Sequence, residues 1–141
     1  MANTYLQVYI QLIFAVKGRQ SFLKPDLRQE FFKVMSFMIK NLGHFPIIVN
    51  GMADHVHCLV GLNPDKKNSD LEKDLKVDSD HFLKDKKWAP GKFQWQNGYG
   101  VFSYSKSHLN NVYNYILNQE IHHQKRSFEM EYKDFLKKFE I

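Results

Sequence analysis

Residues 5–14, Tyr-Leu-Gln-Val-Tyr-Ile-Gln-Leu-Ile-Phe, set the pattern from which the rest of the architecture follows. Apolar side chains alternate there with tyrosines and glutamines, which predicts a β-strand with one buried face. The apolar stretch is only about twelve residues long and contains Gln7 and Gln11, so it is too short and too polar to span a membrane. It also has no basic segment before it and no small-residue cleavage site after it, so we expect no export signal.

Working outward from this strand, the sequence predicts a helix and then two more strands. Pro25 can begin the helix, apolar residues recur every three or four positions, and Gly43 ends it. Residues 45–49 and 56–62 are short, apolar and rich in β-branched side chains. They predict two strands joined at the turn dipeptide Asn50-Gly51, with Asp54 and His55 leaving room for a longer connection.

The second half of the chain begins with a charged segment. Residues 65–87 hold seven lysines and seven acidic residues, and we interpret them as solvated and partly helical. A strand is predicted from Val101, followed by a helix that Ser105 or Ser107 can cap and that runs to about His122. Residues 128–139 form a last amphipathic helix. This order predicts one α+β domain over residues 1–141: a ferredoxin-like sandwich, with helices on one or both faces of an antiparallel sheet and a C-terminal helix.

Composition narrows the functional classes. The chain has 141 residues, with 20 Lys and Arg against 15 Asp and Glu, and a formal net charge of +5. That surplus suits nucleic acid but is weak support on its own, because many metabolic enzymes reach it. The surplus lies on either side of the balanced segment 65–87. The single cysteine, Cys58, excludes an intramolecular disulfide and a Cys-rich zinc site, and it favours the reducing cytoplasm.

His55-Val56-His57 is the sharpest local motif, at the start of a predicted strand. Residues i and i+2 of a strand point to the same face about 6.5 Å apart, so both imidazoles can meet one ion or one phosphate. Asp54 can orient an imidazole as a hydrogen-bond acceptor. The alternative is two polar residues on a solvent face. Cys58 is expected to point to the opposite face, into the core.

A second group of polar residues lies on the predicted helix before His122. Tyr115 and Gln119 are four residues apart and therefore stack on one face. Gln119 offers a neutral oxygen ligand that could complete a site begun by two histidines, and His122, at i+7 from Tyr115, is the alternative ligand. Two histidines, an amide oxygen and a phenol together suggest metal-assisted attack by tyrosine on a phosphodiester.

Three blocks in this order resemble a known family. They are Asp-His-Val-His at 54–57, Trp-Gln-Asn-Gly-Tyr-Gly-Val-Phe-Ser at 95–103, and Tyr-Ile-Leu-Asn-Gln at 115–119 followed by His122-His123. With Lys17-Gly18-Arg19 before them and Glu131-Tyr132 after them, they resemble the single-tyrosine HUH transposases of the insertion sequence 200 type, a family that includes the REP-associated tyrosine transposases. The resemblance covers most of the chain.

The resemblance implies a DNA transposase that cleaves and rejoins single-stranded DNA. Tyr115 would be the nucleophile, leaving a 5′-phosphotyrosine and a free 3′-OH. His55, His57 and Gln119 would hold a divalent ion, Mg²⁺ or Mn²⁺. Members of the family are similar in fold to the sandwich predicted above.

The resemblance also implies the partners. Such proteins work as homodimers on DNA hairpins, and in some of them the tyrosine helix of one subunit serves the histidine pair of the other. Lys17 and Arg19 are candidates to hold phosphates. Tyr99 is a candidate to stack on a base or to shape its loop. Trp95 is a candidate to stack on a base as well, but core packing is the favoured interpretation for it.

One departure keeps a second class of function open. Family members usually carry a helix with Ser, Lys and Trp before the second block, whereas residues 77–82 here are Val-Asp-Ser-Asp-His-Phe. A non-catalytic or domesticated protein that binds single-stranded nucleic acid is therefore the alternative. It would bind in a salt-sensitive way that is indifferent to chelators.

Overall fold

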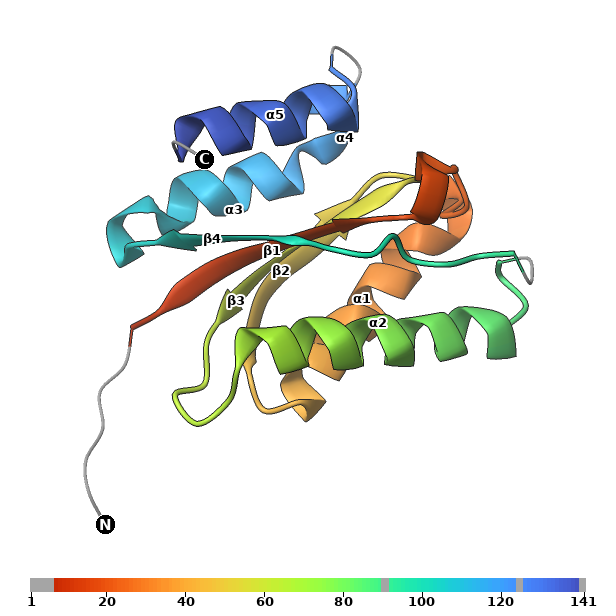
Figure 1. Ribbon diagram of the computed structural model, residues 1–141, viewed down its shortest axis with the longest axis horizontal. Helices are drawn as coiled ribbons and strands as arrows, with labels where there is room; N and C mark the ends of the chain where they lie inside the picture. Colours follow the sequence, from red (N-terminus) through yellow and green to blue (C-terminus); the bar gives the residue numbers. More distant parts are fainter. Residues whose placement is uncertain (1–6, 90–91, 124–125, 140–141) are drawn as a thin grey trace.

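The computed structural model describes residues 7–89, 92–123 and 126–139 (Figure 1). Two short 3-10 helices, η1 (Lys17–Arg19) and η2 (Lys106–His108), accompany the main elements. The strands are β1 (Tyr9–Ala15), β2 (Phe45–Gly51), β3 (His55–Gly61) and β4 (Gly100–Tyr104). The helices are α1 (Pro25–Asn41), α2 (Asn68–Asp85), α3 (Leu109–Leu117), α4 (Gln119–His123) and α5 (Phe128–Lys138).

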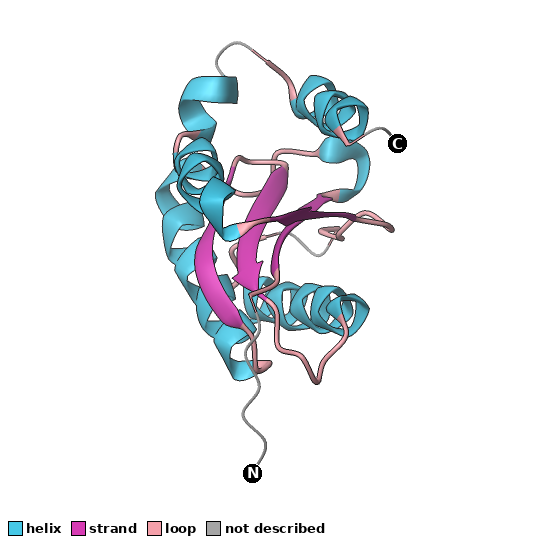
Figure 2. Ribbon diagram, turned by 90° about the vertical axis from the view of Figure 1, so that its left-hand side faces the viewer, coloured by secondary structure: helices cyan, strands magenta, loops and turns pink. Residues whose placement is uncertain are grey.

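The strands form one antiparallel sheet in the order β2-β3-β1-β4. Helices α1 and α2 cover one face, and α3, α4 and α5 lie over the other, as Figures 1 and 2 show. The order strand, helix, strand, strand, helix, strand and the predicted α+β class are confirmed, with helices on both faces and a C-terminal helix.

Alternation along the two central strands separates the two sides of the sheet. Ile10, Leu12 and Phe14 of β1 face α1 and α2 and belong to the largest apolar core. Cys58 of β3 lies in the same core, as its position in the strand predicts. The intervening residues of both strands therefore face the layer of α3 and α5. His57 is one of these residues.

The charged segment folds further than its composition indicates. α2 is a continuous helix of 18 residues rather than a partly helical stretch. Leu71, Leu75 and Leu83 are spaced at four and eight residues, so they fall on one side and are buried in the core. Val77 is exposed, whereas Phe82 packs against the same core beside the leucines.

The turn between β2 and β3 is longer than the Asn50-Gly51 dipeptide predicts. Both residues belong to β2 and pair with β3, and the chain turns after them. The Asn50 amide instead donates to the carbonyls of Ile116 and Leu117, at 2.9 and 3.1 Å, and so satisfies the end of α3. Gly51 is required because a Cβ there would overlap the backbone of His55.

The helix predicted to run to His122 is divided. α3 ends at Leu117, Asn118 leaves the helical region at φ −97° and ψ 29°, and α4 begins at Gln119. In the described part of the chain, no helix is long and apolar enough to cross a membrane.

Candidate metal centre and tyrosine site

Two buried histidines form the base of the site. His55 and His57 lie on β3, opposite Ala15 and Ile13 of β1, and both rings are fully buried. They point to the face that α3 and α5 cover, with their ring centroids 5.2 Å apart. The strand spacing therefore brings the pair together as the sequence predicts.

The outer nitrogen of each ring faces an oxygen acceptor. Asp54 Oδ1 lies 2.8 Å from Nδ1 of His55, and Gln11 Oε1 lies 2.6 Å from Nδ1 of His57. An acceptor at Nδ1 places the single proton of a neutral imidazole there and leaves the Nε2 lone pair directed inward. Burial lowers the pKa of His57, which favours this neutral form.

A further hydrogen bond sets the direction of the Gln11 amide. Gln11 is fully buried, and its Nε2 donates to the Tyr104 hydroxyl oxygen of β4 at 2.8 Å. The amide therefore presents its oxygen to His57. A chain of contacts thus runs across three neighbouring strands, from Tyr104 on β4 through Gln11 on β1 to His57 on β3.

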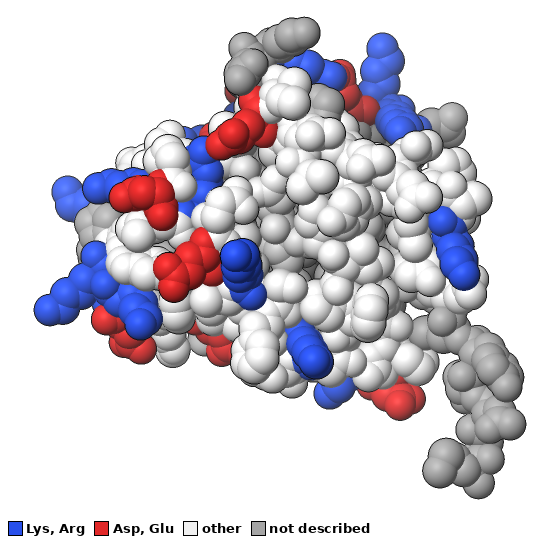
Figure 3. Space-filling view, turned by 180° about the vertical axis from the view of Figure 1, so that it is seen from behind, with Lys and Arg blue, Asp and Glu red and all other residues white. Residues whose placement is uncertain are grey.

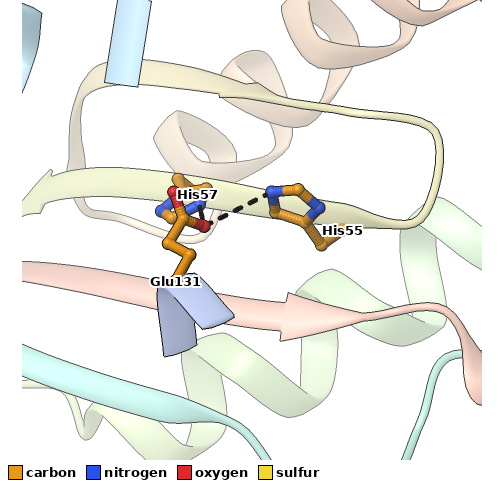
Figure 4. A group of neighbouring side chains, drawn as sticks. All are labelled: His55, His57 and Glu131. Carbon is orange, nitrogen blue, oxygen red and sulfur yellow. Dashed lines mark hydrogen bonds and ion pairs between the residues drawn. The ribbon is translucent and has the colours of Figure 1, made fainter. Parts of the chain in front are cut away.

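Glu131 of α5 supplies a carboxylate to both histidines (Figure 4). Its Oε1 lies 2.9 Å from Nε2 of His57 and 3.6 Å from Nε2 of His55, and the side chain is almost completely buried. Burial alone would raise its pKa, but hydrogen bonds from His123 and Tyr115 hold the pKa well below its usual range. Glu131 is therefore an anion in this site.

These donors fit a small divalent cation. Nε2 of His55, Nε2 of His57 and the Glu131 carboxylate lie within 4.8 Å of one another, and Gln119 Oε1 is 3.1 Å from Nε2 of His55. Two ligands on adjacent corners of an octahedron with bonds of about 2.1 Å are about 3.0 Å apart. Lone pairs that face one another at this separation need a positive charge between them, so nitrogen and oxygen atoms here suit a metal ion.

Tyr115 lies next to this cluster in the same chain. It is half-buried on α3, its hydroxyl donates to Oε2 of Glu131, and its ring centroid is 6.2 Å from that of His57. Burial raises the pKa of Tyr115, and the neighbouring Glu131 carboxylate raises it further. Gln119, one turn later, is fully buried beside it. One chain therefore brings together His55, His57, Tyr115 and Gln119.

His123 stands at the site. His123 Nε2 lies 3.1 Å from Gln119 Oε1 and 3.3 Å from Glu131 Oε2, because it follows Gln119 by one helical turn. Burial lowers its pKa, but hydrogen bonding and attraction to Glu131 outweigh burial and raise it. The side chain of His122 lies outside the described residues.

Glu131 is the site residue that the sequence motifs do not assign. Apart from its place in the family resemblance, its signal is its position on the last helix: it lies three residues after Phe128 and four before Phe135, on the stripe that faces the sheet. An acidic residue on an otherwise apolar helix face is expected to have a buried partner. Which partner it meets follows only from the packing of α5.

The residues predicted to bind DNA lie in two different environments. Lys17 and Arg19 are exposed on η1 and line a groove of about 990 Å³ together with Lys84 and Asn97. Arg19 pairs with Glu129 at 3.0 Å and lies over the Phe128 ring, so it reaches the beginning of α5. Arg19 therefore connects the edge of this groove with α5, the helix that carries Glu131.

The two aromatic residues predicted to stack on bases differ in their exposure. Tyr99 is 37% exposed, with Lys76 Nζ 5.9 Å from its ring centroid. Trp95 lies in the core instead of on the surface: it packs edge-on against Phe14, and its indole N–H donates to Ser79 Oγ at 2.9 Å. Because its ring and its donor are both used, Trp95 does not stack on a base.

Two solved structures that are similar to this chain are described as transposases. A crystal structure of a protein from Deinococcus radiodurans assigned as a transposase matches with a TM-score of 0.62 and 25% identity, covering 84% of this chain and 96% of that one. A REP-associated tyrosine transposase bound to a REP hairpin matches with a TM-score of 0.64 and 14% identity, covering 87% and 73%. No curated protein matches the sequence.

The family comparison agrees with the geometry. The profile described as "Transposase IS200 like" matches residues 4–119, a range that holds the histidine pair, Tyr115 and Gln119 and ends before Glu131. A family of this kind rearranges DNA strands, and a buried pair of histidines beside a tyrosine has the groups for that chemistry. The chain belongs to the IS200-like transposases.

Proposed function

We propose that this protein cleaves and rejoins single-stranded DNA through Tyr115, with Mg²⁺ or Mn²⁺ held by His55, His57 and oxygens of Glu131 and Gln119. The observation that carries the proposal is that the Glu131 carboxylate contacts both a metal-binding histidine and the nucleophilic tyrosine. One oxygen is 2.9 Å from Nε2 of His57, and the other accepts the Tyr115 hydroxyl. The nucleophile and the ligand set are thus joined by one side chain.

The proposed step is a transesterification. The Tyr115 oxygen attacks the phosphorus, the bond from phosphorus to the 3′ oxygen breaks, and a 5′-phosphotyrosine forms. The phenol proton passes to Glu131, and the departing 3′ oxygen takes a proton from water and leaves as the 3′-OH. Because the phosphotyrosine ester keeps the energy of the broken bond, the reverse attack by a 3′-OH rejoins a strand without another energy source.

The site as it stands keeps Tyr115 protonated. Burial and the adjacent carboxylate both raise the pKa of Tyr115, so the phenol ionises only when the negative charge beside it is compensated. A bound divalent cation supplies that positive charge and also neutralises the scissile phosphate. Gln11 and Asp54 keep the two histidine rings in the orientation that such binding needs.

We place the DNA backbone in the groove beside η1. Lys17 and Arg19 offer positive charge there, and Tyr99 offers an exposed ring on which a base can stack. The structural neighbour that is bound to a REP hairpin supports a DNA hairpin as the partner of this chain as well.

We also propose that the chain forms a homodimer. Large apolar side chains are exposed along α3 and α4, at Tyr113, Leu117 and Ile121, and on β2 at Phe45. Figure 3 shows a face of the molecule whose middle is largely free of charged side chains. Exposed apolar surface of this kind is typical of a site that another protein covers.

The test of the proposed reaction is a covalent adduct. The protein is incubated with Mn²⁺ and end-labelled single-stranded DNA that contains a hairpin, across a panel of sequences, and then denatured. We expect a labelled protein band that Tyr115→Phe abolishes and that EDTA prevents. Tyr113→Phe is the matched control, because Tyr113 lies on the same helix two residues earlier and is exposed; this variant should form the adduct normally.

Two results would contradict the reaction. The first is absence of an adduct with every DNA of the panel, and the second is an adduct that persists in Tyr115→Phe. DNA binding without any adduct, unchanged by EDTA and by His57→Ala, would instead support the non-catalytic binding protein.

A further inference from the structure

A second cavity, separate from the basic groove, opens beside Tyr115. It lies between α3 and α5 above the end of β4, and its volume is about 690 Å³. Tyr115 and Glu131 line one end of it. We call it the α3–α5 pocket. Pockets of roughly 300–1,000 Å³ are the size that holds small organic ligands.

One wall of the α3–α5 pocket is aromatic. Tyr104, Phe135 and Phe139 line it, and the Phe139 ring meets the Tyr104 ring edge-on with centroids 5.8 Å apart. Stacking of a nucleobase on an aromatic side chain contributes about 1–3 kcal/mol and tolerates any base. This wall therefore suits a flat heterocycle.

The opposite wall offers hydrogen bonds. Asn111 lines the pocket from α3, four residues before Tyr115, so its amide lies on the same helix face as the nucleophile. Ser105 and His108 line the same wall and are bonded to each other at 2.8 Å. An amide and hydroxyls can pair with the polar edge of a base. Lys138 at the rim adds a positive charge for a phosphate.

We propose that the α3–α5 pocket binds the nucleobase of the nucleotide next to the phosphate that Tyr115 attacks. This inference rests on the proposed function, since it names where the substrate strand lies. A base is joined to its phosphate through a single sugar, so a base seated against Asn111 keeps that phosphate beside Tyr115. A paired base cannot enter a pocket between two helices, so the pocket selects an unpaired strand whatever its sequence.

The test measures the contribution of the bases to binding. It uses Tyr115→Phe protein without metal, so that no cleavage occurs, and two labelled probes of equal length and charge: an oligothymidine and an abasic oligomer. Fluorescence anisotropy gives a Kd for each. We expect Asn111→Met and Ser103→Ile, which fill the α3–α5 pocket from its two sides, to weaken oligothymidine binding at least about fivefold and to leave the abasic oligomer unchanged.

The matched control is Asn110→Met, the same substitution one residue earlier on α3 and outside the lining of the pocket. It should bind both probes as the parent does. Circular dichroism of each variant checks that the fold is intact. The proposal is overturned if both pocket variants bind oligothymidine like Asn110→Met, or if parent protein binds the two probes equally.

Failure of this proposal is distinguishable from failure of the proposed reaction. If Tyr115 forms an adduct and the pocket variants bind oligothymidine normally, the proposed role of the pocket is wrong and the proposed reaction stands. If no adduct forms but Asn111→Met weakens base-dependent binding, the proposed reaction is wrong and the pocket stands as a site for single-stranded DNA.

Discussion

At the scale of single residues, Glu131 changes the chemical character of the site. The ligands that the sequence motifs supply, two imidazoles and an amide, are all neutral in the ligating state. Glu131 adds a negative charge and a hard oxygen, which carboxylates offer to Mg²⁺ and Mn²⁺ in particular. The same carboxylate accepts the Tyr115 hydroxyl, so it also fixes where the nucleophile stands.

Removal of the Glu131 charge should therefore weaken metal binding. We expect Glu131→Gln to raise the Kd for Mn²⁺ at least about tenfold, because an amide replaces the only anionic donor among the described ligands. Isothermal titration calorimetry on the full chain measures it. Glu129→Gln is the control, since Glu129 lies on the same helix but is exposed and pairs with Arg19. Equal Kd values for the two variants would exclude Glu131 as a ligand.

Gln11 acts on the metal through a histidine. Gln11→Leu removes the acceptor that holds the His57 proton on Nδ1, and we expect the Mn²⁺ Kd to rise about 10- to 100-fold, as for other residues that orient a ligand. Tyr104→Phe removes only the group that orients the amide, so its effect should be smaller.

The control for Gln11 is Gln7→Leu, the same substitution at an exposed position just before β1. It should leave the Mn²⁺ Kd unchanged. An unaltered Kd in Gln11→Leu would show that His57 keeps its orientation without the amide.

At the scale of elements, the strands carry most of what the sequence could predict. The alternation of β1 and the spacing of His55 and His57 require only local geometry, so the shared histidine face and the buried Cys58 follow from the sequence. Gln11 belongs to the same pattern, but a polar residue on an alternating strand gives no sign that it faces a histidine instead of water.

What the sequence does not predict depends on contacts between distant elements. Glu131 meets the histidines only because α5 packs back across the sheet, a contact between residues 74 positions apart. Trp95 packs in the core, where Ser79 of α2 accepts its N–H, and no local pattern indicates that partner. His123 lies near the ligands through its contacts with Gln119 and with Glu131 of α5.

The contact between β2 and the end of α3 is one that the fold needs. Asn50 satisfies two carbonyls that a helix end leaves without partners. We expect Asn50→Ala to lower the free energy of unfolding by about 1–2 kcal/mol, measured by urea denaturation. Gln29→Ala, which removes only a longer, exposed bond to Asn50 at 3.4 Å, should cost much less. If Asn50→Ala and the parent protein have the same free energy of unfolding, water replaces the Asn50 amide at no cost.

At the scale of the whole molecule, the sheet separates stability from chemistry. The face toward α1 and α2 holds the largest apolar core, whereas the face toward α3 and α5 holds the polar site between two smaller apolar clusters. In Figure 2 the strands lie between these two helical layers. Polar residues can therefore converge on the sheet without interrupting the main core.

The proposed dimer can be tested by the mass of the molecule in solution. Size-exclusion chromatography with light scattering should give twice the mass of one chain. Leu117→Glu or Phe45→Glu should reduce the measured mass to that of a single chain, because each places a charge on an exposed apolar position. Val77→Glu, at another exposed apolar position, on α2, should leave the dimer intact. A single-chain mass for the native protein would contradict the dimer.

These variants also decide which subunit supplies the tyrosine. Tyr115 contacts Glu131 within one chain, and Glu131 contacts His57 of that chain, so each chain holds a complete set of groups. A monomeric Phe45→Glu variant should therefore still form the DNA adduct, and its rate per chain should match that of the dimer. If the reaction exchanged helices between subunits, the monomer would lose the adduct. Mixing this monomeric variant with Tyr115→Phe protein would then not restore the adduct, because the two chains would have to associate before they could exchange helices.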